Sequence, residues 1–315
     1  MLPKTKPRVS WFKIAYLILA AVAMYLLVSQ LSDLRGGLKD VASSHPKDDA
    51  VVLVFVAGTY FIAALTYLFL SLKPIKYFVT VAIQVAVSTV NKLLPAGIGG
   101  MSANYIYLTN NHHTKPQAAV VVAANTIIGV VANLLLIAIL VLFVPVKSFK
   151  FKSAGPKLAI IACLIVGLVA VIALVYPKLR RYLLHNMKLI FKSLAEYRSH
   201  LAKLGYAILS QMTLTLFYVL ALDYSLKAVG GSLPLSSVML VYSFGVWIGA
   251  AIPAPGGVGS VEAGLAGGLI AFKASLAHAV AAVLVFRLIS LWLPLFIGFI
   301  PLVWSYRRGY LATNK

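Results

Sequence analysis

Charged residues are scarce in this chain, and acidic residues are the scarcest of them. Only 11% of the 315 residues are charged and 61% are hydrophobic, and 7 Asp and Glu stand against 28 Lys and Arg, a net charge of +21. A soluble domain carries roughly 25% charged residues, so this composition excludes a soluble globular enzyme and a disordered protein. The length would allow two soluble domains, but the composition indicates one membrane-embedded body.

Cysteine and nucleotide-binding patterns are also lacking. The single cysteine, Cys163, lies within an apolar run, which excludes a disulfide framework and a cysteine-based metal site. The glycine-rich segments do not end in the Gly-Lys-Ser/Thr of a Walker loop. His112 and His113 are adjacent in a polar segment without further ligands at suitable spacing, and we interpret them as solvated loop residues. We therefore expect no cofactor, no metal and no ATP-driven transport by this chain alone.

Six stretches are apolar and long enough to cross a bilayer as helices, which takes about 20 residues. They cover residues 11–31, 50–72, 118–146, 158–176, 204–226 and 275–304. No small-residue cleavage site follows the first, so we interpret it as a retained span and not as a signal peptide. The basic residues lie between these stretches, which predicts anionic membrane lipids as partners and no nucleic acid.

Two further apolar segments are interrupted by proline and glycine. Arms 77–94 and 101–109 flank the first break, and arms 235–252 and 260–272 flank the second. Arm 101–109 covers only ~14 Å at about 1.5 Å per residue, against a hydrocarbon core of ~30 Å. We predict two re-entrant hairpins, with ordinary surface turns between full crossings as the alternative. The hairpin or gate residues are Pro95, Gly97, Gly99, Gly100, Pro253, Pro255, Gly256, Gly257 and Gly259.

The two halves of the chain repeat one order of elements. Pro95-Ala-Gly-Ile-Gly-Gly100 and Pro255-Gly-Gly-Val-Gly-Ser260 align at an offset of 160 residues, and each half has three spans and one broken pair. Three crossings invert the second half relative to the first, as in secondary transporters. We predict an all-α polytopic membrane protein with a single domain over residues 1–315 and inverted repeats at about 11–146 and 158–304.

The basic residues also set the expected orientation. With a cytoplasmic N-terminus, the inside segments hold 17 Lys and Arg and the outside segments hold 9, in keeping with the positive-inside rule. Loop 147–157, with four lysines and no acid, departs from that rule. We expect a multi-pass protein of the inner (plasma) membrane with both termini in the cytoplasm. Segment 177–203 predicts either a basic amphipathic helix on the cytoplasmic leaflet or a plain solvated helix.

Apart from charges at the loop-facing ends of the spans, three charged residues fall inside the apolar elements: Lys92, Glu262 and Arg287. An intramembrane charge costs about 2.5–3.5 kcal/mol or more and by default marks a functional site. Helical rise places Glu262 ~15 Å and Arg287 ~18 Å below the same face, so we predict that they meet. The pair either receives an anionic head group or is a structural ion pair, and both roles can coexist. Lys92 is either interfacial or faces the same cavity from the first hairpin.

Two asparagines, Asn104 and Asn125, are polar positions in otherwise apolar elements. They either contribute to a substrate site or form interhelical hydrogen bonds that hold the helices together.

Two stretches resemble a known family. Leu94–Leu108, with Pro95-Ala-Gly-Ile-Gly-Gly100, and Ile252–Leu265, followed by Val285-Phe-Arg287-Leu288, are similar to the two signatures of the lysylphosphatidylglycerol synthase/flippase transmembrane family. The resemblance covers residues from about 11 to 305. It implies the movement of aminoacylated or otherwise modified lipids between leaflets, and some relatives without a soluble domain are linked to polyprenyl-linked glycan pathways.

The chain departs from that family in two places. It stops at Lys315 just after the last span, so we expect no soluble synthetase domain and no aminoacyl transfer. Gly100–Ala103 and Asn125-Thr126 stand where relatives often carry acidic and basic residues, which weakens the expectation of a lysyl lipid as substrate.

The sequence as a whole predicts a flippase-like protein that binds and translocates an anionic phospholipid or lipid-linked intermediate. Two alternatives remain open. One is an integral-membrane transferase acting on a lipid phosphate, for which only Glu262 could serve as the base within the membrane. The other is a non-catalytic membrane subunit that docks a separate lipid-modifying synthetase or glycosyltransferase through segment 177–203.

Overall fold

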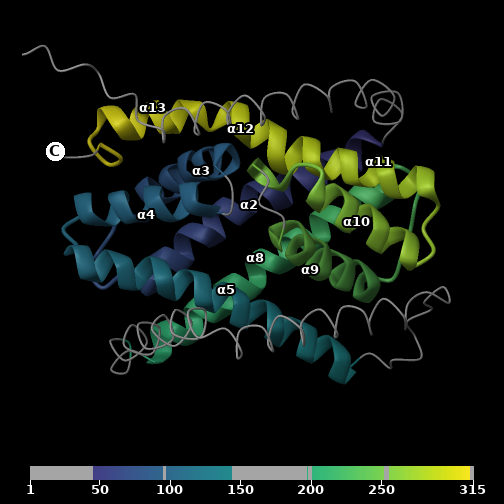
Figure 1. Cartoon of the computed structure of the whole chain (residues 1–315), viewed down its shortest axis with the longest axis horizontal. Coiled ribbons are helices and arrows are strands. Elements are labelled where there is room, and N and C mark those ends of the chain that lie inside the picture. Colours follow the sequence, from purple (N-terminus) through teal and green to yellow (C-terminus); the bar gives the residue numbers. More distant parts are fainter. Residues whose placement is uncertain (1–44, 95–96, 144–196, 198–200, 252–254, 313–315) are drawn as a thin grey trace, which may run out of the picture.

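The computed structural model describes residues 45–94, 97–143, 197, 201–251 and 255–312. Within these ranges the chain is helical and contains no strand (Figure 1). The predicted spans 11–31 and 158–176, and nearly all of the basic segment 177–203, lie outside the described residues. For the part of the chain that the structure describes, the all-α prediction is confirmed.

Four helical runs are long and apolar enough to cross a membrane. They are α2 (Pro46–Leu70), α5 (Lys115–Phe143), α8 (Leu201–Ala228) and a run made of α11 (Leu276–Arg287), η5 (Leu288–Trp292), α12 (Leu293–Ile297) and α13 (Phe299–Arg307). Each coincides with a predicted span to within a few residues. An apolar segment of this length becomes helical in a membrane because the helix satisfies its own backbone polar groups.

The last run is not a uniform helix. Its middle, η5, is a π-helical turn that begins directly after Arg287. Pro294 follows within two residues of the turn, and proline has no N–H to donate to the carbonyl four residues earlier. The irregular turn is therefore placed by the sequence, next to one of the embedded charges. Single π-turns of this kind occur frequently at functional sites.

Four shorter helices form two packed pairs. Helix α3 (Tyr77–Leu93) packs against α4 (Ile98–Asn110), and α9 (Leu235–Ala251) packs against α10 (Ser260–Ala271), with the 3₁₀ turn η4 (Pro255–Gly257) before α10. At 1.5 Å per residue, α4 and α10 extend only ~20 Å and ~18 Å. These helices and their breaks lie where the interrupted arms were predicted, except that α4 begins at Ile98, three residues before the predicted arm 101–109.

Helices α2 and α8 form the centre of the molecule and pack along each other. In Figure 1 the pair α3/α4 lies to one side of them and the pair α9/α10 to the other. Helix α5 runs along one edge of the view, and the run α11–α13 runs along the opposite edge. Helices α12 and α13 pack against α3, which joins the end of the chain to its first short pair.

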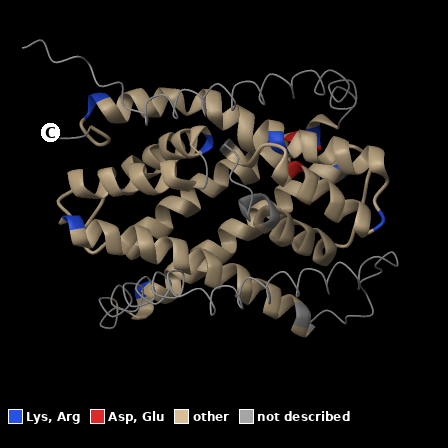
Figure 2. Ribbon diagram, in the orientation of Figure 1, with Lys and Arg blue, Asp and Glu red and all other residues tan. Residues whose placement is uncertain are grey.

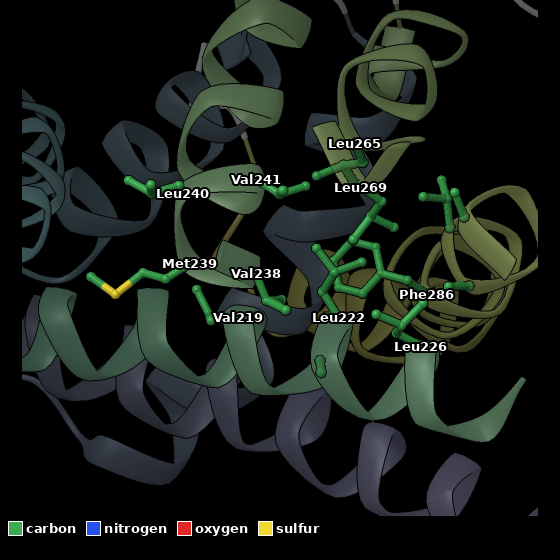
Figure 3. Close-up of a cluster of buried hydrophobic side chains, with 14 of the residues drawn as sticks. Val219, Leu222, Leu226, Val238, Met239, Leu240, Val241, Leu265, Leu269 and Phe286 are labelled. Carbon is green, nitrogen blue, oxygen red and sulfur yellow. The ribbon is translucent and has the colours of Figure 1, made fainter. Parts of the chain in front are cut away.

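The largest buried apolar cluster lies where α8, α9, α10 and α11 meet (Figure 3). Leu222, Val238, Leu265 and Phe286 each contribute to it from a different helix. A second cluster joins the end of α2 to α3, α4 and α5 through residues such as Ile83 and Tyr107. Each short pair is therefore held by its own apolar core against the long helices.

Loops predicted on one side of the membrane lie together in the structure. At one end, Asn110 Nδ2 lies 2.9, 3.1 and 2.9 Å from the carbonyl oxygens of Gly309, Tyr310 and Ala312. At the other end, His45 N donates to the carbonyl oxygen of Ala228 at 3.1 Å. The first contact joins 305–315 to the residue just before 112–115, both predicted inside, and the second joins 32–49 to 223–233, both predicted outside.

Candidate functional site

Lys92 lies in the last turn of α3, and the residues that follow it end the helix. Leu94 is extended, with φ −111° and ψ 140°, as expected for a residue before proline. Lys92 is fifteen residues after Tyr77, so it lies ~22 Å along the helix axis from the end of the bundle where α3 begins. Its Nζ atom is buried and has no hydrogen-bond partner among the described residues.

Glu262 lies in the first turn of α10 and has two partners. Its Oε2 atom accepts a hydrogen bond from the backbone N–H of Gly259 at 2.7 Å, which caps the helix. Its Oε1 atom accepts from Arg287 Nε at 2.6 Å. Arg287 also donates through Nη2 to the carbonyl oxygen of Gly256 at 2.8 Å. The structure thus brings Glu262 and Arg287 together, as their depths predicted, and the pair joins α11 to the turn before α10.

Turn η4 brings Lys92 close to that ion pair. A Cβ atom added at Gly256 would lie 3.4 Å from the backbone oxygen of Lys92, so η4 packs on the last turn of α3. Lys92 and Arg287 are both basic, so a positive charge on each would be mutually unfavourable unless an anion lies between them. We call Lys92, Glu262 and Arg287 the charged cluster; it holds one carboxylate for two cations. Figure 2 shows that the other described basic residues lie mainly near the ends of the helices.

A cavity of about 390 Å³ opens between α2, α3, α4, α5 and α8, and we call it the amide pocket. It includes Asn104 and Asn125, the two asparagines that the sequence predicted as polar positions. The other polar side chains that line it are Thr59, Tyr60, Tyr67, Gln84, Ser88, Asn91, Thr126, Gln211 and Tyr218. None of the described lining residues is charged, so the pocket and the charged cluster differ in chemistry.

Two amide pairs hold the walls of the pocket together. Gln84 Nε2 donates to Asn104 Oδ1 at 2.9 Å and joins α3 to α4. Gln211 Nε2 donates to Asn125 Oδ1 at 2.9 Å and joins α8 to α5. Both asparagines therefore form interhelical hydrogen bonds and also line a cavity. Their positions are compatible with both expected roles, as packing contacts and as part of a substrate site.

The sequence analysis missed the two glutamines, although α3 carried a signal for one of them. Gln84, Ser88 and Asn91 are spaced i, i+4 and i+7, which places them on one face of a helix. A polar stripe on a membrane helix has to face protein or water, because lipid cannot satisfy it. Gln211 lies among Ser210, Thr213 and Thr215 in α8, and no local pattern pointed to its contact with Asn125.

An aromatic wall connects the pocket to the helix that carries Arg287. The rings of Tyr218 and Tyr242 stack with their centroids 5.8 Å apart. Phe286, the residue before Arg287, meets both rings edge-on at 6.4 and 6.2 Å. Tyr218 also lines the pocket. The packed rings thus lie between the pocket and the helix that carries Arg287.

The glycines of the two breaks serve two purposes. Gly99 has to be small, because a Cβ there would lie 2.5 Å from the carbonyl oxygen of Val90 on α3. Gly97, Gly256, Gly257 and Gly259 have φ angles of 72°, 61°, 64° and 84°, a region that favours glycine. Pro95 and Pro253 lie outside the described residues; Pro255 begins η4, and Gly100 donates its N–H to Asn91 Oδ1 at 3.1 Å.

One expectation about a loop is wrong. His113 was interpreted as a solvated residue, but its side chain is only 4% exposed. Its Nε2 accepts from the backbone N–H of Lys73 at 3.2 Å and lies 3.0 Å from Ser71 Oγ. Its Nδ1 lies 3.0 Å from the carbonyl oxygen of Asn111. Burial lowers the pKa of His113 below its ordinary value of about 6.5. The sequence could not anticipate this because the partner loop lies about 40 residues away.

Among the described residues, no group of three or more His, Cys, Asp and Glu side chains could hold a metal ion. We take the charged cluster and the amide pocket together as the candidate site.

Comparison with known families matches residues 13–298 to the family described as "Lysylphosphatidylglycerol synthase TM region". No curated protein matches the chain.

Proposed function

Because the chain belongs to the family of the lysylphosphatidylglycerol synthase TM region, we propose that it binds an anionic membrane lipid, or a lipid-linked phosphate, and moves it between leaflets. The observation that carries this proposal is the buried Lys92 Nζ, which has no hydrogen-bond partner among the described residues. Membership of the family supports a membrane role that involves lipids. The positive charge that Lys92 can carry supports an anionic head group.

A positive charge on Lys92 is unfavourable without a ligand, because the ammonium form loses its hydration without gaining a partner. A phosphate at Lys92 would supply the missing counter-charge and accept hydrogen bonds from the ammonium. Arg287 is less available for this contact, since its Nε and Nη2 atoms already bind Glu262 and Gly256. We therefore assign the direct contact with the phosphate to Lys92. Arg287 adds a second positive charge beside this contact.

Helix α3 enters from one end of the bundle, and Arg287 lies twelve residues after Ser275 at the other end, or ~18 Å along its helix. The charged cluster thus lies at the middle depth of the described helices, where transporter sites usually lie. Translocation needs this placement, because a phosphate has to be stabilised at the depth where hydration is lowest.

We include the inverted repeat in the proposal. The contacts between helices support it, since each contact of one half has a counterpart in the other. Pairs α2–α3, α3–α4 and α4–α5 correspond to α8–α9, α9–α10 and α10–α11, and the equivalent helices α2 and α8 pack on each other. The short lengths of α4 and α10 support re-entrant hairpins, which would open to opposite faces and gate the site alternately.

We also propose one domain in the inner membrane, with both termini in the cytoplasm. The grouping of the loops at the two ends of the bundle supports this topology, and the excess of basic residues in one group supports its orientation. A lipid-phosphate transferase is supported less well, because both carboxylate oxygens of Glu262 are engaged. A role as a docking subunit for a separate synthetase or glycosyltransferase depends on segment 177–203, which lies outside the described residues.

The test is translocation by the purified protein in vesicles. Phosphatidylglycerol with a fluorescent acyl chain is placed in both leaflets, and dithionite quenches only the outer pool, with and without a proton gradient. We expect the intact protein to expose the inner pool faster than empty vesicles do. The variant Lys92→Met should slow this exchange at least tenfold, whereas Lys273→Met, in an exposed turn at the far end, should not. Equal exchange by Lys92→Met and the intact protein would contradict the proposal.

A further inference from the structure

The amide pocket has a depth and a composition that the phosphate contact alone does not explain. Asn125 lies ten residues after Lys115 in α5, and Gln211 lies ten residues after Leu201 in α8. The predicted spans start at residues 118 and 204, so at 1.5 Å per residue both amides lie ~10 Å inside their spans, about a third of a ~30 Å hydrocarbon core. A cavity lined by neutral polar groups at this depth is costly unless a polar ligand or water occupies it.

We propose that the amide pocket binds a neutral, hydroxyl-rich head group, either the glycerol or a single sugar of a membrane lipid. This inference rests on the proposed function in one respect, which is that the same lipid carries its phosphate to Lys92. The lining, volume and depth of the pocket support its ligand independently of that contact.

The lining offers both donors and acceptors, as hydroxyl groups require. A hydroxyl has one donor and two acceptor sites, and an Asn or Gln amide has two N–H groups and an acceptor oxygen. In the amide pocket each pair uses one of these bonds between its own members, from Gln84 to Asn104 and from Gln211 to Asn125. Asn104 Nδ2 also donates to the carbonyl oxygen of Gly100 at 3.0 Å. The amides are thus fixed in orientation by these bonds and retain further capacity for a ligand.

The aromatic residues suit the apolar parts of the same ligand. Tyr60, Tyr67 and Tyr218 line the pocket beside the amides. A tyrosine presents an apolar ring and a polar hydroxyl. A glycerol or a sugar ring likewise alternates C–H and O–H groups, so rings can cover the carbon side while the amides bind the oxygens.

The absence of charge from the described lining argues against a cationic head group. An aminoacyl lipid would place an ammonium in the cavity, and burying a charge is costly unless a counter-charge pairs with it. The described lining has no Asp or Glu. The carboxylate of Glu262 is engaged by Gly259 and Arg287. The pocket therefore favours a hydroxyl-bearing lipid over its aminoacylated form.

The volume limits the size of the ligand. At ~30 Å³ for each water-sized group, about 390 Å³ holds roughly 13 such groups. This is enough for a glycerol or one monosaccharide and too little for an oligosaccharide.

The pocket and the phosphate contact lie close enough to serve one molecule. Asn91 lines the pocket, and Lys92 is the next residue in α3. Consecutive positions on a helix project about 100° apart, so Lys92 lies beside the pocket without lining it. One lipid would therefore reach both sites by placing its phosphate and its hydroxyl-bearing group on adjoining faces of α3.

The experiment measures lipid binding to the purified, full-length protein by native mass spectrometry. Four probes separate the contributions: phosphatidylglycerol, which has phosphate and glycerol; monoglucosyl-diacylglycerol, which has a sugar alone; phosphatidic acid, which has phosphate alone; and lysyl-phosphatidylglycerol, which is aminoacylated. We expect the intact protein to bind at least one of the first two about tenfold more tightly than the lysyl lipid, and the stronger of the two identifies glycerol or sugar.

Three variants test the pocket. Asn125→Leu and Tyr60→Phe each remove hydrogen-bonding atoms from the lining and should weaken binding of the preferred hydroxyl lipid about tenfold. Asn125→Asp retains an acceptor for Gln211 and adds a carboxylate, so it should improve binding of the lysyl lipid about tenfold. The matched control is Asn133→Leu, because Asn133 is another buried asparagine on α5 that does not line the pocket. It should leave all four affinities unchanged.

Two results distinguish the inference from the function on which it rests. If Lys92→Met weakens neither phosphatidylglycerol nor phosphatidic acid while the pocket variants act as expected, the assignment of the phosphate fails and the pocket assignment stands. If Tyr60→Phe and Asn125→Asp fold normally and change no affinity for any probe, the pocket assignment is overturned.

Discussion

Glu262 binds Arg287 through one carboxylate oxygen and caps its own helix through the other. The Oε1–Nε distance is 2.6 Å, and Oε2 accepts from Gly259 N at 2.7 Å. The two side chains are 18% and 10% exposed. A single carboxylate therefore fixes the position of Arg287 and the start of α10, and removing it disturbs both.

Single substitutions in this pair should be more harmful than the double one. Glu262→Ala or Arg287→Ala leaves a buried partner charge and should lower the free energy of unfolding by about 3–5 kcal/mol. Glu262→Gln combined with Arg287→Met leaves no stranded charge and should recover much of that loss. Thermal unfolding in detergent measures the stability, and the vesicle assay measures whether translocation recovers with it. Full recovery of both would assign the pair a purely structural role.

Lys92→Met should behave in the opposite way. The Lys92 ammonium is buried and has no hydrogen-bond partner among the described residues, so replacing it with an apolar side chain of similar length removes an unfavourable burial. We expect the melting temperature to stay the same or rise while lipid translocation falls. A clear decrease in the melting temperature would show that Lys92 has a stabilising partner and would weaken its assignment to a ligand.

The contact between α9 and α10 depends on small residues. A Cβ added at Gly264 would lie 2.8 Å from the backbone oxygen of Gly245. Gly264→Val should therefore destabilise the protein by about 1–3 kcal/mol, or prevent its folding, through overpacking. Gly267 lies on the same helix, and an added Cβ there meets nothing within 4 Å. Gly267→Ala is the matched control and should be neutral or stabilising by up to about 1 kcal/mol. Melting temperatures of the two variants give the comparison.

The His113 contact should make stability depend on pH. Because burial lowers the pKa of His113 in the folded state, the unfolded state binds the proton more readily between the two pKa values. The stabilisation is complete above about pH 6.5, the ordinary pKa of histidine, and is lost as the pH falls toward the folded-state pKa. His113→Gln should cost about 1–2 kcal/mol at pH 7.5 through lost hydrogen bonds and should flatten the pH dependence. Unfolding curves from pH 5 to 8 for both proteins test this.

The topology can be checked with cysteines at described positions. In a Cys163→Ser background, we expect Lys273→Cys to react with an impermeant thiol reagent from outside intact cells. Arg308→Cys, at the opposite end of the bundle, should react only after the cells are opened. The reverse pattern would invert the orientation, and reaction of both from outside would contradict the assignment of the two ends.

Much of the fold follows from local sequence. Apolar runs such as 50–72 and 204–226 predicted α2 and α8 because a membrane helix needs only length and hydrophobicity to satisfy its backbone. The breaks after Leu93 and Ala251 were likewise foreseeable, since proline and glycine act on their immediate neighbours. The depths of Glu262 and Arg287 could be counted along their helices, and the two residues do meet.

The composition of the site required the tertiary structure. In a membrane, apolar side chains face lipid and protein alike, so hydropathy does not tell which face of α5 or α8 turns inward. The bond from Gln211 to Asn125 joins residues 86 positions apart, and the burial of His113 depends on a loop about 40 positions away.

The sequence by itself determined that this is a helical membrane protein and that Lys92, Glu262 and Arg287 lie within its apolar elements. Only the tertiary structure decided how those charges are partnered. In the folded protein the two carboxylate oxygens of Glu262 accept hydrogen bonds from Gly259 and Arg287, and Lys92 has no hydrogen-bond partner among the described residues. The physical reason is that helix boundaries depend on neighbouring residues, whereas the partner of a buried charge depends on how distant helices rotate and pack.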